Sequence, residues 1–146
     1  MATVTLRAHA IRLLARREYS GAELQQRLTS KGGAPEEIRT LIDDLSARGL
    51  LSNARYAQSV VRQKSSRYSR RSIAGALKAK GVDAPAIDAA LNEAAVDDDT
   101  TLIALWQRRF GNPPADDREK ARQVRYLQAR GFSLSSILKL LRTGGL

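Results

Sequence analysis

The sequence of 146 residues contains no cysteine and a single histidine, His9. The absence of cysteine excludes a disulfide framework and any thiolate metal site. One histidine cannot form a Cys–His catalytic pair or a histidine-based zinc site, and we expect His9 to be a surface or boundary residue rather than a general base. None of the ten glycines falls in a phosphate-binding glycine motif. We therefore expect no enzyme, no catalytic residue, no metal, no cofactor and no small-molecule substrate.

Long hydrophobic runs are also missing from the sequence. No run of 18 apolar residues appears, so no segment is expected to span a membrane. Arg7 and Arg12 interrupt any apolar core that a signal peptide would need near the N-terminus. The 42% of hydrophobic residues is too high for a disordered tail. These features predict a soluble, cytoplasmic, folded protein without a membrane partner, and we expect a monomer.

The charge of the chain is strongly positive and unevenly distributed. Lysine and arginine number 25 against 15 acidic residues, which gives a net charge of +10. Between Tyr56 and Val82 there is no Asp or Glu, but there are seven cations: Arg62, Lys64, Arg67, Arg70, Arg71, Lys78 and Lys80. Basic residues at this density attract phosphates and release their counterions. We favour an anion-binding patch here over a solvated charged face.

A repeat of about 50 residues runs through the whole chain. Gly32, Gly81 and Gly131 are spaced 49 and 50 residues apart. A leucine stands four residues before each glycine (Leu28, Leu77 and Leu127), and an isoleucine stands six residues after it (Ile38, Ile87 and Ile137). Such self-similarity at a fixed period is typical of repeat architectures. We predict three tandem units over residues 1–50, 51–96 and 97–146.

The local signals within each unit predict three helices and no strand. Apolar residues recur at spacings of three and four, which is one face of a helix. Ser20 and Glu23 form a predicted capping box, and Pro35 suits the first position of a helix. Further expected helix N-caps are Ser52, Ser69, Asp83 and Ser133, and expected C-terminal glycines are Gly32, Gly49, Gly81 and Gly131. The predicted fold is all-α, an elongated array of three tandem three-helix repeats that resemble helix–turn–helix units.

The one dense acidic run, Asp97-Asp98-Asp99, permits two interpretations. Three carboxylates are possible ligands of Mg²⁺, and a metal-dependent nuclease would use them in that way. Alternatively, Asp at the start of a helix accepts hydrogen bonds from its free amides and interacts with the positive end of the helix dipole. We favour this capping role. We expect three aromatic residues to pack in the core rather than to stack on bases: Trp106, Phe110 and Phe132.

Several segments of the chain resemble the RecX family. The most specific is Glu119–Ser133, which reads EKARQVRYLQARGFS, and Arg67–Ile73 reads RYSRRSI. The resemblance implies three three-helix repeats, binding to the RecA–DNA nucleoprotein filament, and inhibition of strand exchange, ATPase and coprotease activity. It thereby implies modulation of recombinational DNA repair and of the SOS response. The chain departs from the family at Ser52-Asn53, where an acidic pair is usual.

The function predicted from these observations is regulation through binding. Besides the seven cations of the central stretch, Arg122, Arg125 and Arg130 of the third unit are expected to contact DNA or the filament. The partners are then the RecA filament and, without sequence preference, the phosphate backbone of DNA. The alternative is a free-standing, sequence-nonspecific DNA-binding helical module. Whether inhibition occurs by capping or by disassembly of the filament is left open.

Overall fold

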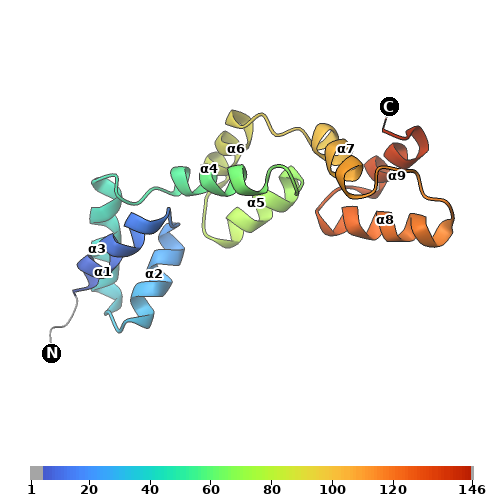
Figure 1. Ribbon diagram of the computed structural model, residues 1–146. Helices are drawn as coiled ribbons and strands as arrows, with labels where there is room; N and C mark the ends of the chain where they lie inside the picture. Colours follow the sequence, from blue (N-terminus) through green and yellow to red (C-terminus); the bar gives the residue numbers. More distant parts are fainter. Residues whose placement is uncertain (1–4, 146) are drawn as a thin grey trace. The chain divides into compact units, whose positions relative to one another are not determined.

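The computed structural model describes residues 5–145 of the chain, and over this range it contains nine α-helices and no strand (Figure 1). This confirms the predicted all-α fold. The helices are α1 (Leu6–Arg16), α2 (Gly21–Ser30), α3 (Pro35–Ala47), α4 (Asn53–Lys64), α5 (Arg70–Ala79), α6 (Ala84–Glu93), α7 (Asp98–Arg109), α8 (Asp117–Ala129) and α9 (Leu134–Thr143). Three successive helices form each predicted repeat.

The helix starts are fixed by the side chains that the sequence indicates. The Ser20 hydroxyl accepts a hydrogen bond from the amide of Glu23, and the Glu23 carboxylate accepts one from the amide of Ser20, both at 3.1 Å. This is the predicted capping box. The side-chain oxygens of the other four predicted N-caps likewise accept a hydrogen bond from the backbone amide three residues later: Ser52, Ser69, Asp83 and Ser133. Each local prediction of a helix start is therefore confirmed.

The helix ends depend on glycines in the left-handed conformation. Gly32, Gly81 and Gly131 have φ angles of +88°, +81° and +92°. At Gly81 the glycine amide donates to the carbonyl of Lys78 at 3.0 Å, and the Val82 amide donates to that of Leu77 at 3.1 Å. This pair of bonds is the Schellman motif, which satisfies the last carbonyls of the helix. The predicted C-terminal glycines are confirmed.

Helix α6 ends in the same motif but without a glycine. Ala95 has a φ of +52°, and the amides of Ala95 and Val96 donate to the carbonyls of Asn92 and Leu91. A side chain in this conformation costs about 1 kcal/mol relative to glycine. We expect Ala95→Gly to raise the melting temperature by about 2–4 °C, measured by circular dichroism. Ala94→Gly, one residue earlier, should not raise it, and equal shifts for the two variants would contradict this assignment.

The contacts of the backbone divide the chain into two compact units, each with its own core. The first comprises the residues up to Ser59 together with Leu77–Ala90, and the second comprises Val60–Ala76 together with the residues from Leu91 onward. In the first unit α2 packs on α1 and α3, and the core contains Ala10, Leu13, Tyr19, Leu24, Leu28, Ile38, Leu41, Leu45 and Leu51. In the second unit α9 packs on α7 and α8, and the core contains Leu102, Leu105, Trp106, Leu127, Phe132, Ile137 and Leu140.

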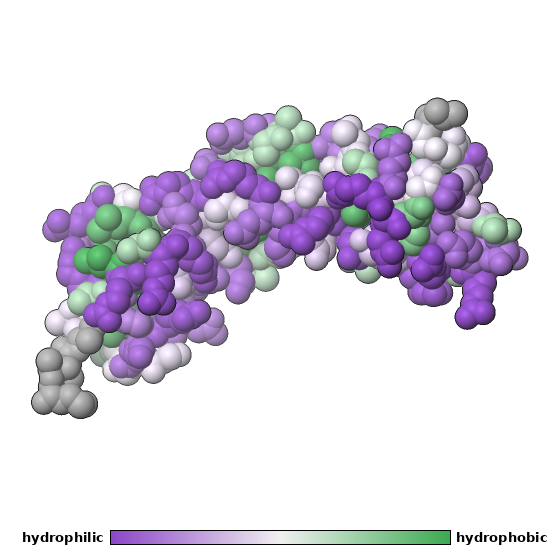
Figure 2. Space-filling model, viewed as in Figure 1, coloured by the Kyte–Doolittle hydropathy of each residue, from purple (hydrophilic) through white to green (hydrophobic). Residues whose placement is uncertain are grey.

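The division into units differs from the division into repeats, because the middle repeat contributes to both units. The residue boundaries predicted for the three repeats therefore remain a prediction. The core positions predicted for Trp106 and Phe132 are confirmed, since they are 2% and 5% exposed. Figure 2 shows hydrophilic side chains over most of the visible surface, with smaller apolar areas between them.

A glycine at the end of a helix packs closely on the start of another helix in both units. In the first unit, a Cβ atom added to Gly81 would lie 3.0 Å from the Cβ of Ala22 near the start of α2. In the second unit, a Cβ added to Gly131 would lie 2.7 Å from the Cβ of Ser72 in the first turn of α5. Gly32 has nothing within 4 Å of its added Cβ among the described residues. Gly81 and Gly131 are thus needed for close packing as well as for their backbone conformation.

Candidate functional site

Five of the predicted basic residues lie in the second unit, at the end of α4 and the start of α5. Arg62, Arg67 and Arg71 are exposed, and Lys64 and Arg70 are partly buried. The Lys64 ammonium lies 5.3 Å from the centre of the Tyr68 ring. Across the described part of the chain, none of the five forms an ion pair with a carboxylate. We call Arg62, Lys64, Arg67 and Arg71 the central basic surface.

Arg70 differs from the other four because its side chain is used within the fold. Its guanidinium donates to the backbone carbonyl of Val96 at 2.9 Å and to the side-chain oxygen of Asn92 at 3.0 Å. Its backbone amide donates to the Asp98 carboxylate at 2.9 Å. These three bonds tie the start of α5 to the end of α6, the start of α7 and the segment between them. The structure therefore gives Arg70 a packing role, and its expected contact with a phosphate stays a prediction.

The third repeat holds the loop between α4 and α5 in place. The amide of Ser69 donates to the carbonyl of Arg130 at 2.9 Å. The Arg108 guanidinium donates to the carbonyl of Ser66 at 2.8 Å, which brings an exposed cation from α7 beside the central basic surface. Sequence reasoning missed Arg108, because it is 42 residues from its partner and no local pattern connects them.

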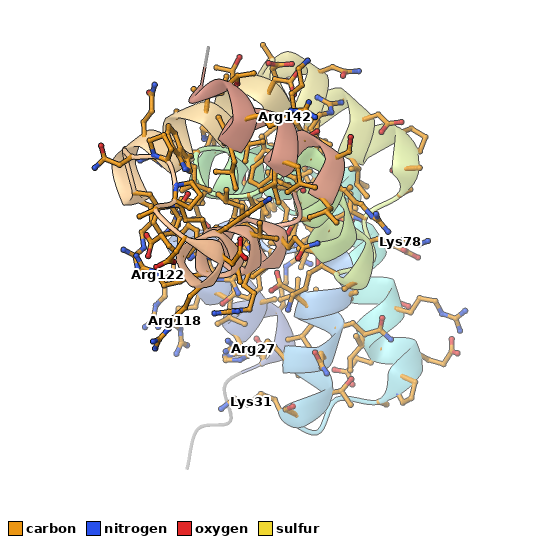
Figure 3. The ribbon with its side chains drawn as sticks, turned by 90° about the vertical axis from the view of Figure 1, so that its right-hand side faces the viewer. Arg27, Lys31, Lys78, Arg118, Arg122 and Arg142 are labelled. Atoms are coloured by element: carbon orange, nitrogen blue, oxygen red, sulfur yellow. The ribbon has the colours of Figure 1, made fainter. Side chains whose placement is uncertain are left out.

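Lys78 and Lys80 belong to the first unit, whereas the five cations described above belong to the second. Lys78 lies on α5 and is exposed; it is labelled in Figure 3. The Lys80 ammonium lies 3.6 Å from the Glu23 carboxylate, which also accepts a hydrogen bond from Arg17 at 3.3 Å. The charge of Lys80 is therefore partly balanced within the protein. Of the two residues, Lys78 is the better candidate for binding an anion.

The Glu23 carboxylate is held in its charged form by these partners. Burial by itself would raise the pKa of Glu23, but the hydrogen bond from the Ser20 amide and the charges of Arg17 and Lys80 outweigh it and lower the pKa below 4.5. A lowered pKa in the folded state means that the charged carboxylate stabilises the fold above about pH 4.5. This contribution is lost as the pH falls through the folded-state pKa.

The pH dependence of Glu23→Gln tests this contribution. At pH 7 the variant should unfold at lower urea concentration than the natural chain, with a loss of about 1–2 kcal/mol, because the charged hydrogen bonds are removed. As the pH falls through the lowered pKa of Glu23 the difference between the two proteins should shrink, because the natural carboxylate becomes protonated. Glu37→Gln, at an exposed position of α3, should cost much less stability at pH 7. A difference independent of pH would contradict the lowered pKa.

The third repeat contributes the remaining predicted cations, two on α8 and Arg130 directly after it. Arg122 is exposed and lies 3.1 Å from the Glu119 carboxylate, and it points in the same direction as Arg118 (Figure 3). Arg125 is exposed on the same helix. The guanidinium carbon of Arg130 lies 3.7 Å from the centre of the Tyr126 ring. Arg122 and Arg130 thus have intramolecular partners that orient them, whereas Arg125 is a simple surface cation.

The acidic run before α7 has a structural role. The Asp97 carboxylate accepts hydrogen bonds from the amide and hydroxyl of Thr100, at 3.0 and 2.7 Å, and these bonds lower its pKa. Asp98 accepts the amide of Arg70. No group of three metal-ligating side chains occurs within residues 5–145, and no helix in this range is long and apolar enough to cross a membrane. The capping role expected for Asp97 is confirmed.

Comparison with known proteins agrees with this arrangement of helices. Family models of the first, second and third three-helix domains of RecX match residues 7–45, 52–91 and 97–141. The regulatory protein RecX of Leptothrix cholodnii is 43% identical over 139 residues, which cover 95% of this chain and 88% of that protein. A Pseudomonas fluorescens protein of the same name is 41% identical over 145 residues, covering 98% and 94%.

Solved structures support the same fold. The crystal structure of RecX from Lactobacillus salivarius has a TM-score of 0.70 at 21% identity, covering 94% of this chain and 93% of that chain. A second crystal structure of a regulatory protein RecX has a TM-score of 0.74 at 21% identity, covering 94% and 73%. With all three domain models matched in order, and relatives above 40% identity over nearly the whole length, this chain belongs to the RecX family of regulatory proteins.

Proposed function

We propose that this protein binds the RecA–DNA nucleoprotein filament and inhibits its strand exchange, ATP hydrolysis and coprotease activity. Through this inhibition it modulates recombinational DNA repair and the SOS response in the cytoplasm. It acts as a monomeric binding protein without catalytic chemistry or a cofactor. The observation that carries the proposal is the central basic surface, whose four cations have no carboxylate partner among the described residues of a RecX-family chain.

The central basic surface suits a filament of protein and DNA for electrostatic reasons. Each lysine or arginine that reaches a phosphate releases a condensed counterion, so a few contacts give appreciable but salt-sensitive affinity. Such contacts do not read sequence, which is the behaviour required of a protein that binds a filament along any DNA. Contacts with successive RecA protomers would then supply the remaining affinity. Both blocking of filament growth and promotion of dissociation are compatible with this mode of binding.

The second candidate function is a free-standing DNA-binding module, and the same exposed cations favour it. The two functions differ in what the surface binds when RecA is absent. Labelled protein should be titrated with single-stranded DNA, bare or coated with RecA, at several salt concentrations between about 50 and 200 mM. Our proposal predicts at least tenfold tighter binding to the filament at the highest salt. Equal affinity for bare DNA and filament would favour the second candidate.

A further inference from the structure

Three arginines surround two aromatic rings on the surface of the third repeat. The rings of Phe110 and Tyr126 meet edge to face, with centres 5.4 Å apart. The guanidinium carbon of Arg109 lies 5.3 Å from the centre of the Phe110 ring and 5.2 Å from that of Tyr126. Arg122 lies 5.4 Å from Phe110, and Arg130 lies 3.7 Å from Tyr126. We call these five residues the arginine–aromatic cluster.

The cluster is accessible to a ligand, because both rings are only partly buried and Arg109 and Arg122 are exposed. The core position expected for Phe110 is therefore only partly correct, since its ring lies at the edge of the third-repeat core. Among the described residues, Arg122 alone of the three arginines has a carboxylate partner, Glu119. The three arginines therefore carry more positive charge than the one paired carboxylate balances. Stacking on the rings also orients the arginines in advance, which reduces the entropy lost when a ligand binds.

A hollow of about 350 Å³ adjoins the cluster and is lined in part by Arg109, Phe110 and Arg122. This volume lies within the usual range of small-ligand pockets, about 300–1,000 Å³. The hollow is preformed because buried Gln123 fixes its wall. Gln123 donates to the carbonyl of Asn112 at 3.2 Å and accepts the indole N–H of Trp106 at 2.9 Å.

The chemistry of the hollow suits a nucleobase better than a phosphate. Its lining includes the donors Arg109 and Arg122 together with the carboxylates of Asp116 and Glu119. A phosphate would be repelled by these carboxylates, whereas the edge of a base carries both donors and acceptors. The guanidinium planes of Arg109 and Arg122, which the rings hold in position at the hollow, offer surfaces on which bases can stack. The remaining arginine charge is available to the phosphates between bases. Bases in a duplex are stacked on each other, so only a single strand can present them in this way.

We propose that the arginine–aromatic cluster and the adjoining hollow bind single-stranded nucleic acid through stacked bases. This inference deepens the proposed function. It rests on that function only in identifying the bound strand as the DNA of the filament. The binding itself can be measured without RecA. A failure of this inference is therefore distinguishable from a failure of the proposed function, which is measured on the filament.

The test uses the full chain and a short labelled oligothymidylate, with a duplex of equal length for comparison. Arg109→Gln combined with Arg122→Gln, and separately Tyr126→Leu, should each weaken binding of the single strand about tenfold, because a stacked base contributes about 1–3 kcal/mol. The matched control is Arg118→Gln combined with Lys120→Gln, which removes two exposed charges from the same helix outside the cluster. It should weaken binding by about threefold at most through general charge loss.

Tyr126→Phe separates loss of the ring from loss of folding. It retains the ring and should bind the single strand as the natural chain does, while melting curves identify any variant that fails to fold. Equal weakening by the cluster pair and the control pair would overturn the proposal in favour of general charge attraction. Equal affinity for single strand and duplex would overturn it as well. Displacement of the strand by polyglutamate at comparable charge concentration would instead indicate an acidic protein ligand and would also overturn it.

Discussion

Replacement of Arg62, Arg67 and Arg71 by glutamate in one variant should raise the protein concentration needed for half-inhibition of RecA by about tenfold to hundredfold. All three side chains are exposed and have no carboxylate partner among the residues that the structure describes. If each contact with a phosphate or acidic group contributes about 0.5–1 kcal/mol, three together account for this range. Arg70 is excluded from the variant because its replacement would break bonds to Val96 and Asn92.

A matched variant controls for net charge. Arg12, Arg16 and Lys31 are also exposed and lie in the first unit, so Arg12→Glu, Arg16→Glu and Lys31→Glu together change the charge by the same amount. This variant should inhibit within about threefold of the natural chain, as expected for general charge loss. The melting temperatures of both variants establish that they are folded. Equal loss of inhibition in the two variants would show that the central basic surface has no special role.

Gly131→Ala should lower the free energy of unfolding by about 2–4 kcal/mol, which is the largest stability change we expect from one methyl group in this chain. The φ of +92° already disfavours a side chain by about 1 kcal/mol. The added Cβ would also lie 2.7 Å from the Cβ of Ser72 and within contact distance of the Ser69 hydroxyl. These atoms belong to the start of α5, where Ser69 caps the helix and donates its amide to the Arg130 carbonyl. Overpacking of this kind typically costs about 1–3 kcal/mol.

Gly32→Ala separates the cost of the backbone conformation from the cost of overpacking. Gly32 has almost the same φ, +88°, but an added Cβ meets nothing within 4 Å among the described residues. This variant should therefore lose only about 1 kcal/mol, the cost of the backbone conformation. Urea unfolding of the three proteins under identical conditions measures both differences. Equal losses at Gly32 and Gly131 would contradict the close packing of Gly131 on α5.

The features predicted correctly from the sequence are those determined by neighbouring residues. The helix caps at Ser20, Ser69 and Ser133 and the glycine at Gly81 act within one turn, so a short pattern suffices to identify them. The three-helix repeat was equally visible, because its leucines and glycines recur at a fixed period.

The features that the sequence did not indicate depend on residues far apart in the chain. Arg70 was grouped with the ligand-binding cations, although its partners are Asn92 and Val96, more than twenty residues away. Phe110 and Tyr126 were not recognised as one surface, because only the fold brings α7 and α8 together. The middle repeat likewise shares its residues between two units, which a linear division into three repeats could not anticipate.

ATP hydrolysis by RecA on single-stranded DNA, measured while the natural chain is titrated in, tests the central claim most directly. The account predicts that hydrolysis falls progressively to a low plateau as the protein is added. It further predicts that the variant lacking Arg62, Arg67 and Arg71 requires at least about tenfold more protein for the same effect. Hydrolysis that stays unchanged at protein concentrations well above that of RecA would contradict the proposed function.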